Sequence, residues 1–227
     1  MSATQQPWVD EAALASVVRF YWLTRRQRLA LTAVAALVLF MSASVLLAST
    51  APLYSYTGGY IEGEISFTWY RLSILGQPVS VPVLDSVVHL SFVLILGPLL
   101  ASALTLPSAY YSLRGPRVPR AVLEAAVAGL VVAGLTAALF ASFTRLVLVE
   151  VVHNIPRGAT EPTAYGRLVF AESRAGYTPE GIYALRLALY SVPASLALVA
   201  AAALLHLYIQ RYYEDILDEP PLRGHHS

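Results

Sequence analysis

Four long runs of apolar residues dominate the chain, and each is long enough to cross a lipid bilayer. A spanning helix needs about 20 consecutive apolar residues, because the hydrocarbon core is about 30 Å thick. The four runs cover residues 29–49, 87–106, 121–152 and 182–208. The polar sequence between them is too short to enclose them as buried core helices. The pattern therefore predicts an all-α integral membrane protein built on a four-transmembrane-helix bundle.

These runs also predict the organisation of the chain. A flanking segment at 1–28 precedes a membrane domain at 29–208, and a polar tail follows at 209–227. Three connections separate the spans: residues 50–86, 107–120 and 153–181. The apolar core of a secretory signal is usually only about 7–15 residues long. The first run is longer, so we expect it to remain as a membrane anchor.

Arginine is distributed unevenly among the polar segments, and this predicts an orientation. The segment before the first span holds four arginines, and the connection at 107–120 holds three without any acidic residue. In the connections at 50–86 and 153–181, acidic residues and longer sequence dilute the arginines. Cytoplasmic loops carry the excess of basic residues. We therefore expect a cell-membrane protein with both termini in the cytoplasm.

The segment before the first span is predicted to form an amphipathic helix over residues 8–28. Its apolar positions recur at helical spacing and form one stripe: Leu14, Val17, Val18, Tyr21 and Trp22. Aromatic residues and arginines beside a span are typical of a helix lying at the membrane interface. The alternative is a cytoplasmic extension of the first transmembrane helix.

The connection at 50–86 changes to a period of two, which is typical of half-buried strands. Apolar Ile61, Ile65, Phe67 and Trp69 alternate with polar residues, and residues 79–83 alternate again. This predicts a small extracellular β-hairpin between the first two spans, with Tyr54, Tyr56, Tyr60, Trp69 and Tyr70 at or above the aromatic belt. Residues 165–170 form a candidate short strand that would complete an outer sheet.

Four helices with a strand pair after the first one superficially resemble the claudin architecture, which also has a tryptophan in its first loop, as Trp69 is here. The resemblance ends there. Claudins use a cysteine pair in that loop and a Gly-Leu-Trp context, and this chain has neither. No family is assigned from the sequence.

Composition excludes several kinds of chemistry. The net charge of +1 argues against a nucleic-acid binder, and the absence of cysteine removes disulfides and thiol chemistry. The sequence contains no phosphate-binding loop, nucleophile elbow or HExxH motif, so a non-enzymatic role is favoured. All 15 basic residues are arginine, and asparagine occurs once. This pattern fits a thermophilic prokaryote or a GC-rich genome.

Two pairs of polar residues at the outer ends of spans form a candidate metal site. Asp85 and His89 are four residues apart, and Glu150 and His153 are three apart, so each pair shares a helix face. Together they offer two nitrogen and two oxygen ligands, a set that suits zinc, copper or non-haem iron. Haem between the two histidines is the related possibility. The alternative is ordinary polar residues at helix ends, with Asp85 as an N-cap.

A structural ion-pair cluster is the favoured explanation for the charges near the same boundary. Arg145 lies just over one helical turn from Glu150, and Arg186 enters the fourth span from the same side. Ionisable groups within membrane helices are costly and are usually paired. We therefore expect these three residues to tie the third and fourth spans together.

Small residues on the third span predict close helix packing. They recur at steps of four: Ala125, Gly129, Ala133, Ala137 and Ala141. Such a stripe fits packing inside one bundle about as well as contact with a second copy. The Gly97–Pro98 pair is expected to kink the second span near its middle.

These features favour a non-enzymatic scaffold or accessory subunit of a membrane complex. Its partners would be the lipid bilayer and a protein or a second copy of the chain, contacted through the outer β-element and the small-residue helix faces. No cofactor is assigned. The alternatives are a metal- or haem-binding redox protein and a channel or transporter subunit that requires oligomerisation.

Overall fold

The computed structural model describes residues 20–57, 61–151 and 174–218, and over them the chain is mostly helical. Four helical segments have the length and composition to cross a membrane, as the hydrophobic pattern predicts. They are α2 (Arg25–Thr50), α3 with α4 (Pro82–Leu90 and Phe92–Arg114), α5 with the π-helix η1 (Arg120–Thr144 and Arg145–Val151), and α8 (Pro179–Asp218). The chain also forms two β-sheets, so the all-α class is too narrow.

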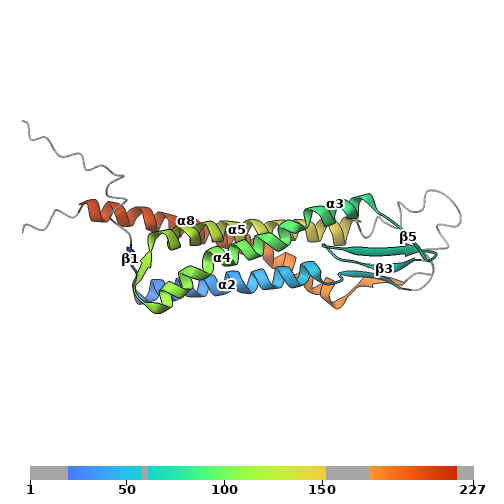
Figure 1. Ribbon diagram of the computed structural model, residues 1–227, viewed down its shortest axis with the longest axis horizontal. Helices are drawn as coiled ribbons and strands as arrows, with labels where there is room; N and C mark the ends of the chain where they lie inside the picture. Colours follow the sequence, from blue (N-terminus) through green and yellow to red (C-terminus); the bar gives the residue numbers. More distant parts are fainter. Residues whose placement is uncertain (1–19, 58–60, 152–173, 219–227) are drawn as a thin grey trace, which may run out of the picture.

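Helix α5 occupies the middle of the bundle. It packs against α4 on one side and α8 on the other, while α2 packs mainly on α4 (Figure 1). Two glycines of α5 allow this approach: a Cβ at Gly129 would lie 3.1 Å from the Ala101 carbonyl oxygen of α4, and one at Gly134 would lie 3.1 Å from the Ser195 carbonyl oxygen of α8. Small residues therefore bring α5 close to both neighbours.

The N-terminal helix predicted over 8–28 is wrong at residues 20–24, and residues 8–19 lie outside the described part of the chain. Residues Phe20–Trp22 form strand β1, and α2 begins only at Arg25. Thr24 starts that helix with a capping box, in which its side chain accepts the Gln27 amide and the Gln27 side chain accepts the Thr24 amide at 2.8 Å. Such reciprocal bonds stabilise a helix start, so the chain turns there instead of continuing from an earlier helix.

The second span extends beyond its predicted limits at both ends. Pro82 opens α3, where proline at the first helical position loses no hydrogen bond; the strand predicted over 79–83 is therefore wrong. The helix is interrupted at Ser91, whose hydroxyl and amide both bond the Val88 carbonyl, at 2.7 and 3.3 Å. Helix α4 then runs through Pro98 and Pro107 to Arg114.

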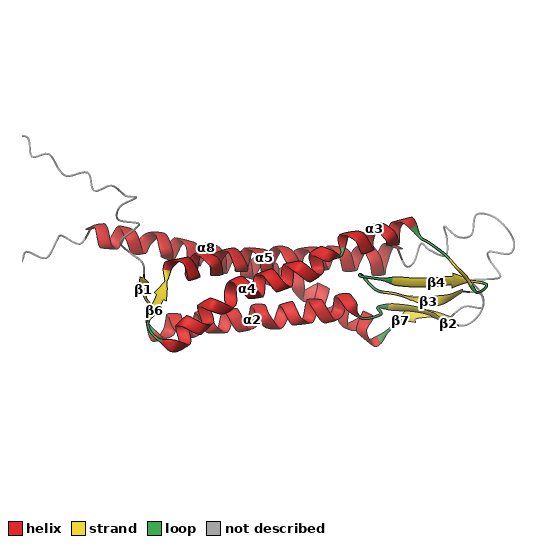
Figure 2. Ribbon diagram, viewed as in Figure 1, coloured by secondary structure: helices red, strands yellow, loops and turns green. Residues whose placement is uncertain are grey.

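A five-stranded antiparallel sheet stands on one end of the bundle (Figure 2). Its order is β5-β4-β3-β2-β7, with β2 at Tyr54–Thr57, β3 at Ile61–Ile65, β4 at Tyr70–Ile74, β5 at Gln77–Pro78 and β7 at Arg174–Tyr177. Two features differ from the predicted single hairpin. A turn splits the alternating segment into β3 and β4, and β7 arrives from the third connection. The strand predicted at 165–170 lies outside the described residues.

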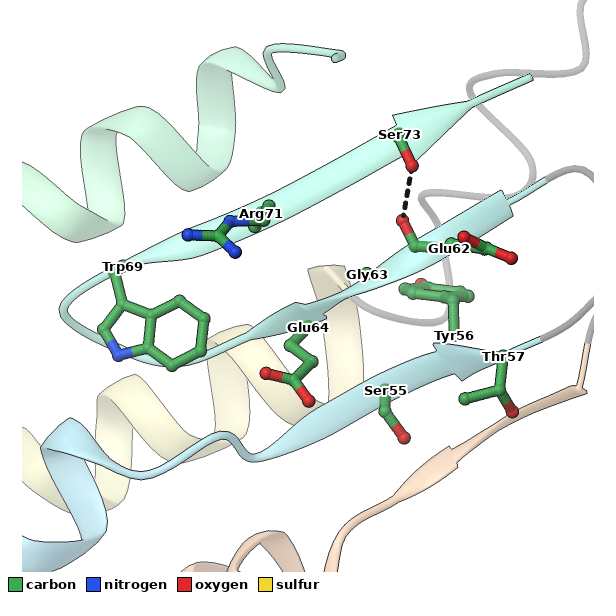
Figure 3. Close-up of a pocket in the computed structure, with 9 residues that line it drawn as sticks. All are labelled: Ser55, Tyr56, Thr57, Glu62, Gly63, Glu64, Trp69, Arg71 and Ser73. Atoms are coloured by element: carbon green, nitrogen blue, oxygen red, sulfur yellow. Dashed lines mark hydrogen bonds between the residues drawn. The ribbon is translucent and has the colours of Figure 1, made fainter. Parts of the chain in front are cut away.

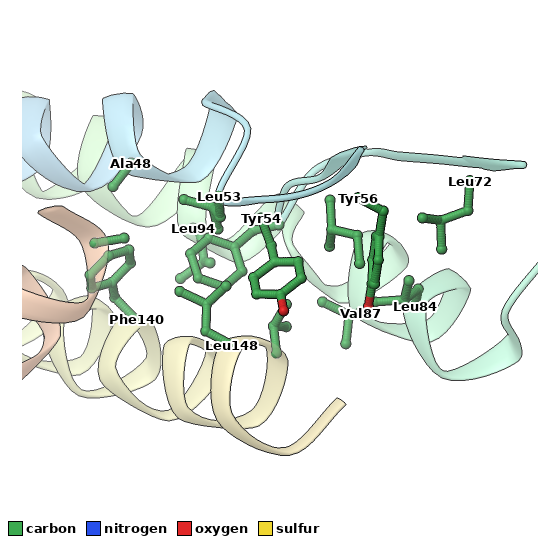
Figure 4. Close-up of a cluster of buried hydrophobic side chains, with 14 of the residues drawn as sticks. Ala48, Leu53, Tyr54, Tyr56, Leu72, Leu84, Val87, Leu94, Phe140 and Leu148 are labelled. Carbon is green, nitrogen blue, oxygen red and sulfur yellow. The ribbon is translucent and has the colours of Figure 1, made fainter. Parts of the chain in front are cut away.

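One apolar core joins this sheet to the helices (Figure 4). Its buried members include Tyr54, Tyr56, Ile61, Ile65, Phe67 and Leu72 from the sheet region, Leu84 and Val87 from α3, Phe140 from α5, Leu148 from η1 and Ala184 from α8. Tyr54 and Tyr56, which were expected at or above the aromatic belt, have their side chains buried in this core. Burial raises the pKa of Tyr56, and neighbouring Tyr54 adds to this, so the phenol remains neutral.

A smaller ribbon closes the opposite end of the bundle. Strand β1 pairs antiparallel with β6 (Arg117–Pro119), which lies between α4 and α5. The first and last described residues both lie at this end (Figure 1). We call it the arginine end because it gathers Arg25, Arg26, Arg28, Arg114, Arg117, Arg120 and Arg211. The other end is called the sheet end.

Candidate functional site

The sheet has one face on the apolar core, and its opposite face is hollowed (Figure 3). The hollow has a volume of about 680 Å³. Its lining comes from three neighbouring strands and the turn beside them: Ser55, Tyr56, Thr57, Glu62, Gly63, Glu64, Trp69, Arg71 and Ser73. Most of these side chains are polar or charged, and we call the site the polar hollow.

Strand alternation explains why this face is polar. In β3, Ile61 and Ile65 are buried in the core, whereas Glu62 and Glu64 are exposed on the other side. Successive side chains of a strand point to opposite faces. The register places Glu64 opposite Arg71 and Glu62 opposite Ser73, so the polar positions of β3 and β4 coincide.

Gly63 lies between these glutamates at a point where a side chain has no room. Its φ of +151° belongs to a region that residues with a side chain rarely adopt, and a Cβ there would collide with the Arg71 carbonyl oxygen. It pairs with Tyr56 on one side and Leu72 on the other. Glycine at this position therefore permits the close β3–β4 pairing under the hollow.

The turn between β3 and β4 fixes the hollow to helix α2. The Ser66 and Thr68 hydroxyls donate to the Ser49 carbonyl at 2.9 and 3.1 Å, and the Trp69 indole N–H donates to the Thr50 carbonyl at 3.0 Å. These bonds satisfy carbonyls that the last turn of a helix leaves unpaired. They also hold the Trp69 ring at the rim of the hollow beside Glu64 (Figure 3).

Within the part of the chain that the structure describes, the side chains of Glu62, Glu64 and Arg71 form no salt bridge. The one salt bridge among the described residues joins Arg120 to Glu124, at the other end of the molecule. The Glu62 contact is through its backbone carbonyl, which accepts the Ser73 hydroxyl at 3.3 Å. Two carboxylates and a guanidinium therefore line the hollow with their bonding capacity available to another molecule, and the Trp69 ring lies beside them.

Asp85 is not the N-cap of α3, which was one of its two predicted roles. It lies in the first turn of α3, whose N-cap is Val81, and its carboxylate accepts the Tyr70 hydroxyl at 2.5 Å and the Ser80 hydroxyl at 2.6 Å. The Tyr70 oxygen in turn accepts the Val81 amide at 3.0 Å. Asp85 thus ties the start of α3 to strand β4 and is not its N-cap.

The proposed metal ligands are only partly within the described residues. His89 is exposed, and its Nδ1 lies 2.6 Å from the Asp85 carbonyl oxygen. His153 and the Glu150 side chain lie outside the described part, so the four-ligand site stays a prediction. Within the described residues, no three histidine, aspartate or glutamate residues are grouped so as to hold a metal ion.

The other predicted groups lie on the bundle. Arg145 opens η1, and Arg186 is exposed on α8; their pairing with Glu150 stays a prediction. The stripe on α5 faces its neighbours at its centre: Gly129, Ala133 and Ala137 are buried, and Ala125 and Ala141 are half-buried.

No protein-family model matches the chain, and no curated protein or solved structure matches it either. Four helices of this length and composition indicate a multi-pass helical membrane protein.

Proposed function

We propose that this chain is a non-enzymatic scaffold or accessory subunit of a membrane complex, and that the polar hollow is the surface on which a partner protein docks. The observation that carries the proposal is the single apolar core shared by the sheet and all four spans. A sheet anchored in this way moves with the helices as one body. A partner bound to it would therefore be held in a fixed position relative to the membrane.

The composition of the hollow supports a protein partner. Tryptophan and arginine are enriched among residues that dominate binding energy at protein interfaces, and Trp69 and Arg71 both line the hollow. Glu62 and Glu64 add two negative charges on one strand. Complementary charges on a partner would select it and fix its register.

A crosslinking experiment tests this docking surface. A photoreactive amino acid at Ser55 or Ser73 should give one discrete protein adduct in membranes of the cells that naturally make this chain. The same group at Val83, exposed on α3 outside the hollow, should not. The double charge reversal Glu62→Arg with Glu64→Arg should abolish the adduct while the helical content and melting temperature stay unchanged. Equal adducts from all positions, or an adduct that survives the reversal, would refute the proposal.

The arginine asymmetry supports an orientation with the sheet outside the cell and both termini in the cytoplasm. Seven arginines are at the arginine end, against Arg71, Arg145 and Arg186 among the described side chains nearer the sheet. An even number of spans also puts both chain ends on one side.

Cysteine labelling tests this orientation, because the native chain contains no cysteine. We expect Gln77→Cys, exposed in β5, to react with an impermeant maleimide on intact cells. Gly115→Cys, where a Cβ meets nothing within 4 Å, should react only after the membrane is permeabilised. The reverse pattern would place the sheet in the cytoplasm.

A further inference from the structure

The ribbon at the arginine end is firmly anchored on one face. Its central pair, Tyr21 of β1 and Val118 of β6, is completely buried, together with Leu123 of α5. The Leu23 amide donates to the Pro116 carbonyl at 2.8 Å and continues the pairing toward α2. Leu23 and Ile209 of α8 complete the same apolar cluster. The ribbon is therefore a fixed part of the bundle and not a loose connection.

Its other face presents large aromatic side chains. Phe20 is 51% exposed and Trp22 is 55% exposed, while Tyr110 and Tyr111 at the end of α4 are also exposed. These rings lie where four apolar helices of spanning length end. Tryptophan and tyrosine concentrate at this level of a membrane, between the headgroups and the acyl chains.

Two guanidinium groups are held against these rings. The Arg117 guanidinium carbon lies 4.5 Å from the centre of the Trp22 ring, and that of Arg114 lies 4.4 Å from the centre of the Tyr110 ring. A stacked guanidinium uses its flat face for the ring and keeps its N–H donors free at its edge. That edge matches the paired oxygens of a phosphate group.

Two neighbouring arginines differ from Arg114 and Arg117, because their N–H donors are bonded within the chain. Arg28 donates from Nε to the Ser112 carbonyl at 2.5 Å, and Arg120 pairs with Glu124 at 2.5 Å. In the described part of the chain, Arg114 and Arg117 have no ion pair. Glu124 is the one acidic side chain described at this end, and it is already paired. The described side chains at this end therefore carry a net positive charge.

We call the surface formed by Phe20, Trp22, Tyr110, Arg114 and Arg117 the ledge. We propose that the ledge binds the headgroup phosphate of an anionic phospholipid. The two guanidinium edges bind the phosphate, and Phe20 and Trp22 lie among the upper acyl chains. Charge complementarity selects the anionic lipid, because a zwitterionic headgroup brings its own cation close to the phosphate. This role is independent of the partner proposed for the polar hollow.

Quenching of tryptophan fluorescence by brominated lipids tests the ledge. The protein used is full length, with Trp8→Phe and Trp69→Phe, so that Trp22 is the one reporter among its three tryptophans. In mixed vesicles, brominated phosphatidylglycerol should bind about thirtyfold more tightly than brominated phosphatidylcholine, as expected for two charge contacts. Arg114→Gln with Arg117→Gln should reduce this preference to about onefold.

Three controls make the result decisive. Arg71→Gln removes an exposed arginine at the sheet end and should leave the preference unchanged. Arg117→Lys keeps the charge and the ribbon but loses the planar edge, so the preference should fall several-fold. Inorganic phosphate in excess should not displace the lipid. Equal quenching by both lipids, an equal loss in Arg71→Gln, or displacement by free phosphate would overturn the proposal.

Discussion

Replacing Phe67 by alanine should lower the free energy of unfolding by about 3–5 kcal/mol, the usual cost of removing a buried phenyl ring. Phe67 lies in the turn between β3 and β4 and is completely buried. Its ring meets Phe140 of α5 edge to face, with the centroids 5.8 Å apart. The substitution would leave a cavity where the sheet joins the helices. Chemical denaturation in detergent, followed by circular dichroism, measures this loss.

Leu75→Ala provides the matched control for this substitution. Leu75 occupies the β4–β5 turn and is 66% exposed, so its truncation should change stability by no more than about 0.5 kcal/mol. In the Phe67 variant, the backbone amides of the strands that line the hollow should also exchange hydrogen faster than those of the spans. A Phe67 effect as small as that of Leu75 would mean that the sheet and the bundle are energetically separate.

Gly63→Ala should disrupt the sheet while leaving the four spans helical. A Cβ at this position collides with the Arg71 carbonyl and lies 2.9 Å from the Leu72 Cα, and the backbone φ of +151° is unfavourable for alanine. Strain of this kind costs about 1–3 kcal/mol by itself, and the collision with backbone adds to it. We expect β3 and β4 to lose protection from amide hydrogen exchange, and the crosslinked adduct at Ser73 to disappear.

Gly176→Ala is the control within the same sheet. Gly176 lies in β7, opposite Ser55 of β2, and a Cβ there meets nothing within 4 Å. It should leave hydrogen exchange and crosslinking as in the native protein. If Gly63→Ala behaved like Gly176→Ala, the close β3–β4 pairing described here would be incorrect.

The four spans were predictable because hydropathy over about 20 residues depends on the local sequence alone. The start of α2 was also encoded locally, since Thr24 and Gln27 form a capping box, but the helical stripe over 8–28 outweighed this signal. Pro82 was likewise a helix-start signal. It was interpreted as part of a strand, because residues 79–83 alternate between apolar and polar positions.

The polar hollow was harder to predict from the sequence, because it depends on which strands lie side by side. The alternation of Glu62 and Glu64 with isoleucines was visible and correctly placed the glutamates on the face away from the core. Ser55 was missed, although Tyr54–Thr57 alternates rings with hydroxyls. No local pattern indicates that β2 pairs with β7, since Tyr54 and Tyr177 are far apart in the chain.

That pairing has a consequence for the order in which the protein is made. Helices α2 and α8 make few contacts along their length, and they are joined at the sheet end by β2 and β7 and by the Thr178 amide, which donates to the Leu53 carbonyl at 3.1 Å. During synthesis, β2 emerges with the first span, whereas β7 arrives only just before the fourth. Until then β2 has an unpaired edge, the kind of edge that promotes aggregation. Chains truncated before Arg174 should therefore be the forms that quality-control proteases remove fastest.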